Sequence, residues 1–177
     1  MTDTERWLEK YASHFIKKIG IQEKDTVLDF GCGPGYYTIP AAKRAGKGTV
    51  YALDKNKERL NTVRERAESE NLSNIKIIHT SGGTEIPLDD ALVDVVLLYD
   101  VLHSHHFSSS ERRKLLEEVE RAAKPHALIS VYPHHMKTER AYKELVDANF
   151  LFEKKIVTTV LHNRTLVEDT VLNFRKP

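Results

Sequence analysis

The stretch Val27-Leu28-Asp29-Phe30-Gly31-Cys32-Gly33-Pro34-Gly35 is a short apolar strand that runs directly into a glycine-rich turn. Closely spaced glycines let the backbone approach a ligand without interference from Cβ atoms, and the helix that follows offers free N–H groups at its N-terminus. The spacing is G-x-G-x-G, whereas the dinucleotide fingerprint G-x-G-x-x-G would need glycine where Tyr36 stands. The loop therefore indicates a ligand-binding turn and argues against a nicotinamide cofactor.

A second acidic residue stands where a cofactor-binding carboxylate is expected. Asp54 directly follows the apolar run 49–53. A carboxylate at this place can accept hydrogen bonds from both hydroxyls of an adenosine ribose. Taken alone, Asp29 could cap the glycine turn and Asp54 could cap the next helix. Because the two acids occur in the same register, each beside a strand end, a cofactor site is favoured over two unrelated caps.

The rest of the sequence alternates between apolar runs of strand length and helical patterns. The first amphipathic segment ends at Gly20, and the last two apolar runs form a predicted antiparallel hairpin around the turn 162–165. Helices are predicted at 4–19, 36–45, 56–70, 108–124 and 138–148, and strands at 27–30, 49–53, 75–78, 93–99, 128–132, 152–161 and 166–174.

This order predicts an α/β fold with a doubly wound sheet that is mostly parallel, has an antiparallel C-terminal edge hairpin, and carries helices on both faces. In such sheets ligands bind beyond the carboxyl ends of the strands. No repeat or flexible linker divides the sequence, so residues 1–177 are expected to form one domain. Within it, 21–177 would be the cofactor-binding core, and the helix in 1–20 would be either a lid or a packing element.

The composition argues against several classes of function. The formal net charge of +1 gives no general attraction to nucleic acid or to acidic membranes. The single cysteine, Cys32, cannot form an intramolecular disulfide or a cysteine-based zinc site. No uncharged apolar run approaches the roughly 18 residues that span a bilayer, and the polar first residues do not resemble a signal peptide. The prediction is a cytoplasmic protein with no membrane partner.

Three stretches resemble class I S-adenosylmethionine-dependent methyltransferases. Val27 to Thr38 looks like the family's first signature, Tyr51 to Asp54 like its ribose-binding strand end, and Val93 to His103 like its fourth-strand signature beside the methionine part of the cofactor. The likeness runs from about residue 22 to the C-terminus. It implies a Rossmann-like, seven-stranded sheet whose last two strands form the edge hairpin. It also implies S-adenosylmethionine as methyl donor and S-adenosylhomocysteine as product.

Two positions depart from the family's pattern. Many members carry an Asp after the third strand that accepts from the adenine amino group; here the contact would come from Ser81 or from backbone. The usual Lys-Pro-Gly-Gly turn reads Lys124-Pro125-His126-Ala127, which requires His126 to take a tight-turn conformation. The resemblance implies the following cofactor-binding residues: Asp29, Phe30, Gly31, Cys32, Gly33, Gly35, Tyr36, Asp54, Lys55, Ser81, Gly82, Tyr99 and Asp100.

Histidines cluster after two strands that the resemblance makes neighbours. Because parallel neighbours lie about 4.8 Å apart and end at the same edge, the clusters are expected to converge within about 10 Å. Three interpretations stay open: hydrogen-bonded or solvated loop residues, a general base that orients the acceptor, and a site for zinc, nickel or iron. One cluster is His103, His105 and His106, and the other is His134 and His135. The catalytic candidates are His103, His134 and Asp100. A bound metal is not the favoured interpretation, and the candidate ligands for one are His103, His106, His134 and His135.

Methyl transfer needs aligned reactants and exclusion of water, so the lack of a catalytic triad is expected. The methyltransferases that modify nucleic-acid bases carry an Asn/Asp-Pro-Pro-aromatic motif at the place of residues 99–102, and this sequence lacks that motif. Arsenite methylation relies on several cysteines, whereas this sequence has one. The predicted function is S-adenosylmethionine-dependent methyl transfer to an unidentified acceptor, with a small molecule favoured over nucleic acid. A non-catalytic cofactor-binding regulatory module and, with less support, a nicotinamide-dependent oxidoreductase are the alternatives, and a homodimer is left open.

Overall fold

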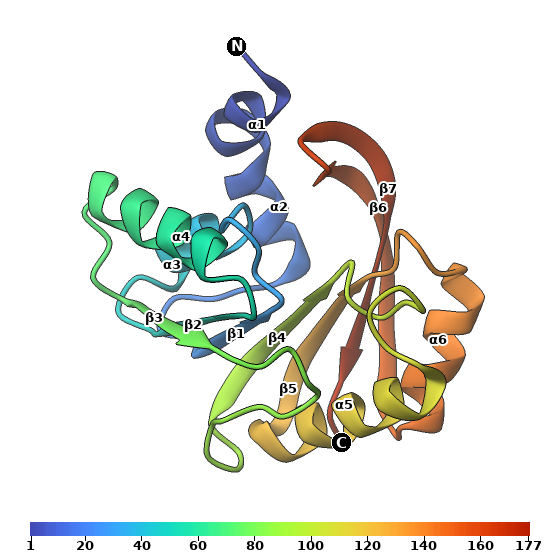
Figure 1. Cartoon of the computed structure of the whole chain (residues 1–177). Coiled ribbons are helices and arrows are strands. Elements are labelled where there is room, and N and C mark those ends of the chain that lie inside the picture. Colours follow the sequence, from blue (N-terminus) through green and yellow to red (C-terminus); the bar gives the residue numbers. More distant parts are fainter.

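Seven strands form one sheet in the order β3-β2-β1-β4-β5-β7-β6 in the computed structural model, which describes residues 1–177 (Figure 1). Neighbours among β1 to β5 run parallel, whereas β7 runs antiparallel to both β5 and β6. The predicted doubly wound sheet with an antiparallel edge hairpin is therefore confirmed. The strands are β1 (Val27–Phe30), β2 (Val50–Asp54), β3 (Ile75–His79), β4 (Val93–Tyr99), β5 (Ala123–Tyr132), β6 (Leu151–His162) and β7 (Thr165–Arg175).

Helices cover both faces of the sheet, as the alternating pattern predicts (Figure 1). Along β1, Val27 packs in the core that includes α2 and α3, whereas Leu28 and Phe30 pack in the core that includes α5 and α6. This alternation follows from the two-residue period of a strand. The helical elements are α1 (Asp3–Arg6), η1 (Trp7–Tyr11), α2 (Ala12–Ile19), α3 (Thr38–Ala45), α4 (Lys57–Ser69), α5 (Ser109–Ala122) and α6 (Thr138–Asp147).

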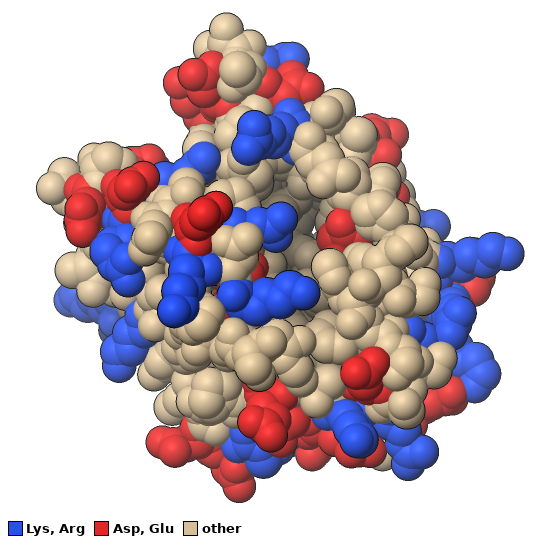
Figure 2. Space-filling model, in the orientation of Figure 1, with Lys and Arg blue, Asp and Glu red and all other residues tan.

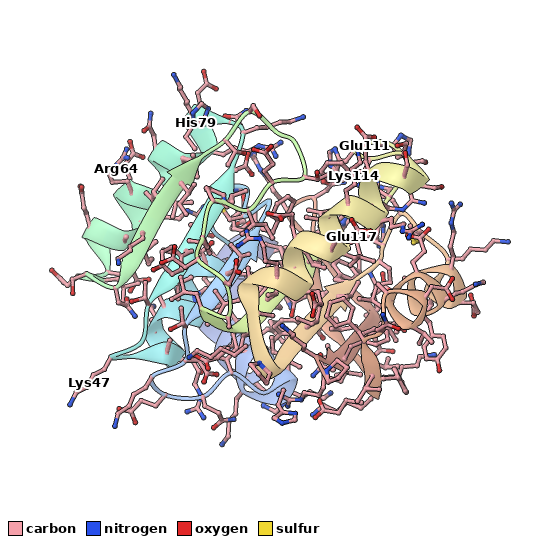
Figure 3. All side chains as sticks on the ribbon, turned by 90° about the horizontal axis from the view of Figure 1, so that it is seen from below. Lys47, Arg64, His79, Glu111, Lys114 and Glu117 are labelled. Carbon is pink, nitrogen blue, oxygen red and sulfur yellow. The ribbon has the colours of Figure 1, made fainter.

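Helix α5 shows how the sequence pattern fixes its orientation on the sheet. Leu115 and Val119 are fully buried, whereas Glu111, Lys114 and Glu117 are exposed and point away from the sheet (Figure 3). Ser108 and Glu111 form the predicted capping box at its N-terminus. No helix in the structure combines the length and the apolar character that crossing a membrane would require.

The N-terminal segment differs from the single regular helix that the sequence predicts. Its middle turn, η1, is wound as a π-helix. Trp7 in this turn is fully buried, its indole N–H donates to the carbonyl of Tyr36 at 2.9 Å, and its ring packs on Phe15 and Tyr37. The N–H of Leu166 donates to the Asp3 carboxylate at 3.1 Å. The segment is thus fastened to the glycine turn on one side and to the β6–β7 hairpin on the other.

β5 begins at Ala123 rather than at residue 128 because the chain already pairs there with Val93 of β4. A register shift follows, and His126 within it has φ +64°. Its N–H donates to the carbonyl of Lys176 at 3.1 Å, which holds the turn against the C-terminal residues. The tight-turn conformation expected of His126 is confirmed.

Candidate active site

A cavity of about 910 Å³ opens at the carboxyl ends of the parallel strands. Small-molecule sites typically enclose roughly 300–1,000 Å³, so its size suits a cofactor and an acceptor together. Its wall comes from the loops after β1, β2, β3 and β4, the end of β5, and the turn between β6 and β7. Figure 2 shows the hollow in the middle of this face, with cationic side chains beside it. The lining cations are Lys55, Arg59 and Arg164.

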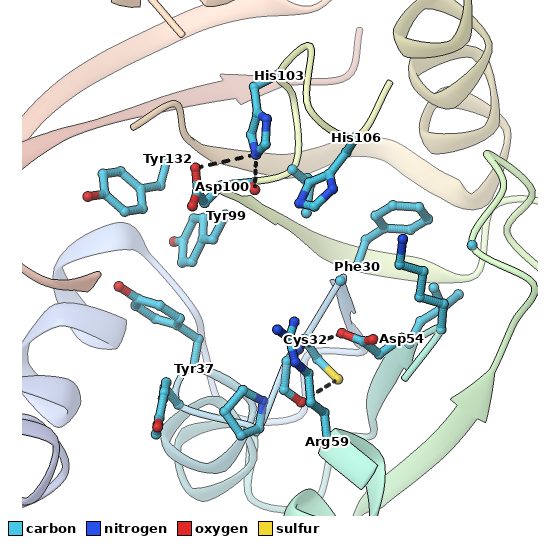
Figure 4. A pocket seen from close by; sticks show the side chains of 18 of the residues that line it. Phe30, Cys32, Tyr37, Asp54, Arg59, Tyr99, Asp100, His103, His106 and Tyr132 are labelled. Carbon is cyan, nitrogen blue, oxygen red and sulfur yellow. Dashed lines mark hydrogen bonds and ion pairs between the residues drawn. The ribbon is translucent and has the colours of Figure 1, made fainter. Parts of the chain in front are cut away.

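Asp54 holds the glycine turn in place from the neighbouring strand. Its carboxylate lies in the cavity wall and is only 5% exposed. One oxygen accepts the N–H of Gly33 at 2.8 Å, and the other accepts the N–H of Asn56 at 2.8 Å. Figure 4 shows the Asp54 side chain beside Cys32 of the turn. A carboxylate offers about four lone-pair sites, so acceptor capacity remains for ligand hydroxyls.

Gly33 is the place where the turn presents bare backbone to the cavity. It has φ +55°, and a Cβ built there would meet no atom within 4 Å. By contrast, a Cβ at Gly31 would come within 2.6 Å of the Val101 side chain. Gly31 is therefore required by packing, whereas Gly33 leaves space that a ligand can occupy at the backbone. This cradle and the carboxylate of Asp54 fit the adenosine of the cofactor that the resemblance implies.

Asp29 lies behind the turn rather than in the cavity wall. It is 2% exposed and accepts the hydroxyl of Thr38, at the start of α3, at 2.6 Å. Burial, together with the nearby Asp54 charge, raises the pKa of Asp29 to about 7 against the opposing effect of the Thr38 bond. Gly35 also lies outside the wall, because a Cβ there would face Val63 at 3.1 Å.

The other predicted cofactor residues divide between the wall and its surroundings. Phe30, Cys32, Tyr36 and Lys55 line the cavity. After β3, the wall is made by Thr80, Gly82 and Gly83, and Ser81 does not take part. Gly82 and Gly83 can offer only backbone to the cavity, whereas Ser81, the side chain considered for adenine recognition, is absent from the wall. Burial raises the pKa of the Cys32 thiol, which donates to the Gly33 carbonyl at 3.5 Å, as expected of a packing residue.

Asp100 marks the end of β4 with an unusual backbone. It has φ +56°, and its N–H donates to the carbonyl of Tyr132 at 2.8 Å. Left-handed backbone outside glycine is tolerated best by Asn and Asp, and it concentrates at functional sites. Its carboxylate lies 2.6 Å from Nδ1 of His135 and 3.4 Å from Nδ1 of His162. Asp100 therefore joins the loop after β4 to the histidines of two other strand ends.

The two predicted histidine clusters converge. The ring centroids of His103 and His135 are 5.0 Å apart, and those of His105 and His135 are 6.0 Å apart. A further histidine that was not among the predicted candidates, His162, joins them, and its ring lies 5.0 Å from that of His135. The signal was present in the topology: β5 and β6 both run antiparallel to β7, so the end of β6 must lie at the same edge as the end of β5.

His103 is fastened within its own loop. Its Nδ1 accepts the N–H of His105 at 3.2 Å, so Nε2 carries the proton and donates to the Asp100 carbonyl at 3.0 Å. The residue is 5% exposed, and burial holds the pKa of His103 below its usual value. His106 also lines the cavity (Figure 4). Burial and the charge of Lys55 lower the pKa of His106, which keeps its imidazole neutral near pH 7.

His134 is the candidate that the structure does not bring into the cavity wall. Its Nδ1 lies 2.8 Å from the Asp169 carboxylate and 2.9 Å from the Tyr132 hydroxyl, which also donates to Asp169. Burial acts to raise the pKa of Asp169, but the hydrogen bonds from His134, Thr170 and Tyr132 outweigh it and leave that pKa below its usual value. The carboxylate therefore stays charged and fixes the ring of His134.

An apolar aromatic wall closes the side of the cavity next to the histidines. The rings of Tyr37 and Tyr99 meet edge to face at 4.7 Å, and Tyr99 meets Tyr132 at 6.4 Å. The Tyr99 hydroxyl bonds to Ser130 at 2.8 Å, and the Tyr37 hydroxyl donates to the Leu161 carbonyl at 3.0 Å. Because these hydroxyls have interior partners and burial raises their pKa values, the wall offers neutral ring surface.

Comparisons with known proteins agree with this geometry. The family profile described as "Methyltransferase domain" matches residues 27–126. A demethylmenaquinone methyltransferase of Geobacillus sp. (strain WCH70) is 26% identical over 144 residues, which are 81% of this chain and 59% of that protein. A probable cobalt-precorrin-6B C(15)-methyltransferase of Methanosarcina acetivorans is 33% identical over 85 residues, 44% of this chain and 46% of that protein. The chain thus spans roughly half the length of these curated relatives.

Among solved structures, a SAM-dependent methyltransferase from Aquifex aeolicus superposes with a TM-score of 0.78 and 26% identity, covering 98% of this chain and 93% of that one. The family profile matches more than half of the chain. The first strand, the glycine turn, Asp54 and the fourth-strand end all lie within the matched residues. The chain belongs to the methyltransferase domain family, that is, to the class I S-adenosylmethionine-dependent methyltransferases.

Proposed function

We propose that this chain binds S-adenosylmethionine in the cavity and transfers its methyl group to a small-molecule acceptor. The observation that carries the proposal is the pair formed by Asp54 and Gly33. A buried carboxylate and a bare glycine backbone face the same cavity and are joined by a 2.8 Å hydrogen bond. Oxygen acceptors for a ribose and space for close approach of a ligand are thereby placed side by side.

Asp54 would accept the ribose hydroxyls of the cofactor, and the backbone of the loop after β3 would hold its adenine. Gly33 would let the cofactor approach the turn, Gly31 would keep the turn packed against Val101, and Asp100 would border the methionine part of the cofactor. Asp29 and Gly35 lie outside the wall and support the turn from behind. When bound, the sulfonium supplies an activated methyl carbon; attack by an acceptor lone pair breaks the carbon–sulfur bond and leaves S-adenosylhomocysteine.

The residues of this chain would align the acceptor, exclude water and accept a proton. The neutral ring surface of Tyr99 and Tyr132 excludes water beside the histidines. We assign proton removal to Nε2 or Nδ1 of His106, because this imidazole faces the cavity and its pKa is held below the usual value. His103 fastens the loop that carries His106, since both of its ring nitrogens are engaged there.

A small-molecule acceptor is supported by the size of the cavity and by the relatives. The matched relatives are named for methylation of demethylmenaquinone and of a cobalt-precorrin, both of them small molecules. The acceptor of this chain, its cytoplasmic location and its dimerisation stay predictions.

Calorimetric titration with S-adenosylmethionine, S-adenosylhomocysteine and NAD tests the cofactor. We expect micromolar binding of the first two and none of NAD. Incubation of the protein with deuterium-methyl S-adenosylmethionine and a metabolite extract, followed by mass spectrometry, then tests catalysis. A labelled product supports an enzyme. Binding without any labelled product would support the regulatory module instead, and a lack of S-adenosylmethionine binding would overturn the proposal.

A further inference from the structure

Three imidazoles from two strand ends meet beside the cavity, with His135 and His162 in its wall and His134 just outside it. His134 and His135 follow β5, and His162 ends β6. The ring centroids are 4.9 Å apart for His134 and His135, 5.0 Å for His135 and His162, and 3.7 Å for His134 and His162. One ring nitrogen of each lies within 4.8 Å of the other two.

Carboxylates determine which nitrogen of each ring holds the lone pair. An ionised carboxylate only accepts hydrogen bonds, so a ring nitrogen beside it carries the proton. Nδ1 of His134 faces Asp169 at 2.8 Å, and Nδ1 of His135 faces Asp100 at 2.6 Å. In the neutral form of each ring, the lone pair is therefore on Nε2.

His162 has the same arrangement. Its Nδ1 lies 3.4 Å from the second oxygen of Asp100, and its Nε2 lies 2.8 Å from the side-chain nitrogen of Asn163. An amide nitrogen only donates, so Nε2 of His162 holds a lone pair that now accepts from the exposed Asn163 amide, and a bound ion would displace that amide. Three imidazoles that each turn Nδ1 toward a carboxylate match the outer-sphere arrangement that metal-binding histidines almost always show.

We propose that His134, His135 and His162 bind a divalent transition-metal ion of the zinc, cobalt or nickel type, with Asp169 and Asp100 orienting the rings. Imidazole nitrogen is a preferred ligand of these ions. Zinc bonds of about 2.0–2.1 Å in a tetrahedral site place ligand nitrogens roughly 3.3 Å apart. The side chains of His134 and His135 are 31% and 37% exposed, so small shifts that keep their Nδ1 contacts with Asp169 and Asp100 can close the remaining gap between the ligand nitrogens.

Three protein ligands leave an open position on a tetrahedral ion, which is typical of catalytic rather than structural zinc. His135 and His162 line the cavity, so the open position is available to a molecule that enters there. This step rests on the proposed function: the acceptor would be a small molecule with a thiol, hydroxyl or carboxylate that binds the ion. Binding to the ion lowers the pKa of such a group. Its proton would pass to His106 and its lone pair would attack the methyl carbon.

Titration of metal-free protein with Co²⁺, followed by visible absorption, tests the site, with Zn²⁺ as competitor and calorimetry for stoichiometry. We expect one ion per chain, bound at micromolar concentration or tighter and displaced by Zn²⁺. His135→Gln and His162→Gln should each weaken binding more than tenfold. Asp169→Asn should weaken it about 10–100-fold, because outer-sphere carboxylates contribute that much. His14→Gln is the matched control, since His14 is exposed on α2, and it should bind like the wild type.

No cobalt binding, or unchanged binding in folded His135→Gln and His162→Gln variants, would overturn the metal site. Circular dichroism and thermal unfolding check that each variant is folded. Titration with S-adenosylmethionine on the same preparations separates the two proposals. If S-adenosylmethionine binds and the metal does not, only the metal site is overturned. If the metal binds and S-adenosylmethionine does not, only the methyltransferase proposal is overturned.

Discussion

Gly33 donates its N–H to Asp54 at 2.8 Å, which joins the glycine turn to the end of the neighbouring strand across 21 positions of the sequence. The other oxygen of Asp54 accepts the N–H of Asn56, the residue that caps α4. The same carboxylate thus shapes the turn and offers its remaining lone pairs to the cavity. A substitution of Asp54 therefore changes both the affinity for the ligand and the stability of the loop, and separate experiments measure the two effects.

Asp54→Asn should weaken S-adenosylmethionine binding about tenfold to a hundredfold. A hydrogen bond to a charged acceptor contributes about 1.5–3 kcal/mol, and the amide removes the charge while preserving the shape. Asp54→Ala should also lower the free energy of unfolding by about 1–3 kcal/mol, because the N–H groups of Gly33 and Asn56 lose their partner. Calorimetry and urea unfolding measure the two effects. Asp89→Asn, at an exposed site, is the control; wild-type affinity in both Asp54 variants would remove this residue from the site.

Gly33→Ala should abolish detectable S-adenosylmethionine binding, because its Cβ projects into the cavity space left by the glycine. The positive φ also costs about 1–2 kcal/mol of stability for any residue with a side chain. Gly46→Ala separates the two effects, since Gly46 has φ +59° but lies outside the cavity wall. The control should lose at least as much stability in urea unfolding, because its ψ of −100° lies outside the left-handed region, and it should keep its affinity. Equal affinities of the two variants would show that the turn does not contact the cofactor.

Asp29 should make the protein less stable as the pH rises from about 4 to about 7. Burial raises the pKa of this carboxyl to about 7, so in that interval the folded state holds a proton that the unfolded chain has released. Stability then falls with a slope of up to about 1.4 kcal/mol per pH unit and levels off above pH 7. Asp29→Asn keeps an acceptor for Thr38 and should flatten the slope. Parallel stability–pH curves for wild type and variant, from urea unfolding, would contradict this assignment.

Trp7→Ala should lower the free energy of unfolding by about 3–5 kcal/mol, as expected for removal of a fully buried indole. The indole bonds to Tyr36 and packs on Phe15 and Tyr37, and no residue of 1–20 lines the cavity. This favours the packing element over the lid for the N-terminal segment. Urea unfolding gives the stability. A lid would instead show unchanged global stability with an altered rate of S-adenosylmethionine release, measurable by stopped-flow fluorescence.

His106→Gln should lower kcat about a hundredfold with the acceptor found by the mass-spectrometric screen, as is usual for loss of a general base. Because burial and Lys55 hold the pKa of His106 below its ordinary value, the wild-type rate should persist to a pH below the usual titration range of histidine. The variant should lose that inflection, while His14→Gln retains it. An unchanged pH–rate profile in His106→Gln would assign the proton to another group.

Several features of this protein follow from the sequence by itself. Local patterns were enough to predict the sheet, its antiparallel edge and the glycine turn. These patterns are the strand and helix periods, the position of Asp54, and the spacing of Gly31, Gly33 and Gly35. The convergence of His103 with His135 followed once the family resemblance made β4 and β5 neighbours, because parallel neighbours end at one edge. His162 was predictable on the same ground, once β6 is recognised as parallel to β5.

Only the tertiary structure decided how individual side chains are used. The Asp29 carboxyl points inward and accepts a hydrogen bond from Thr38, and His134 contacts Asp169 outside the cavity wall. Both ring nitrogens of His103 form hydrogen bonds within its own loop. These outcomes depend on rotamers and on hydrogen-bond partners, some of them more than thirty positions away, which packing brings together. A residue's type and its distance from a strand end limit where its side chain can reach. The neighbours supplied by other elements determine whether it faces the ligand or the protein.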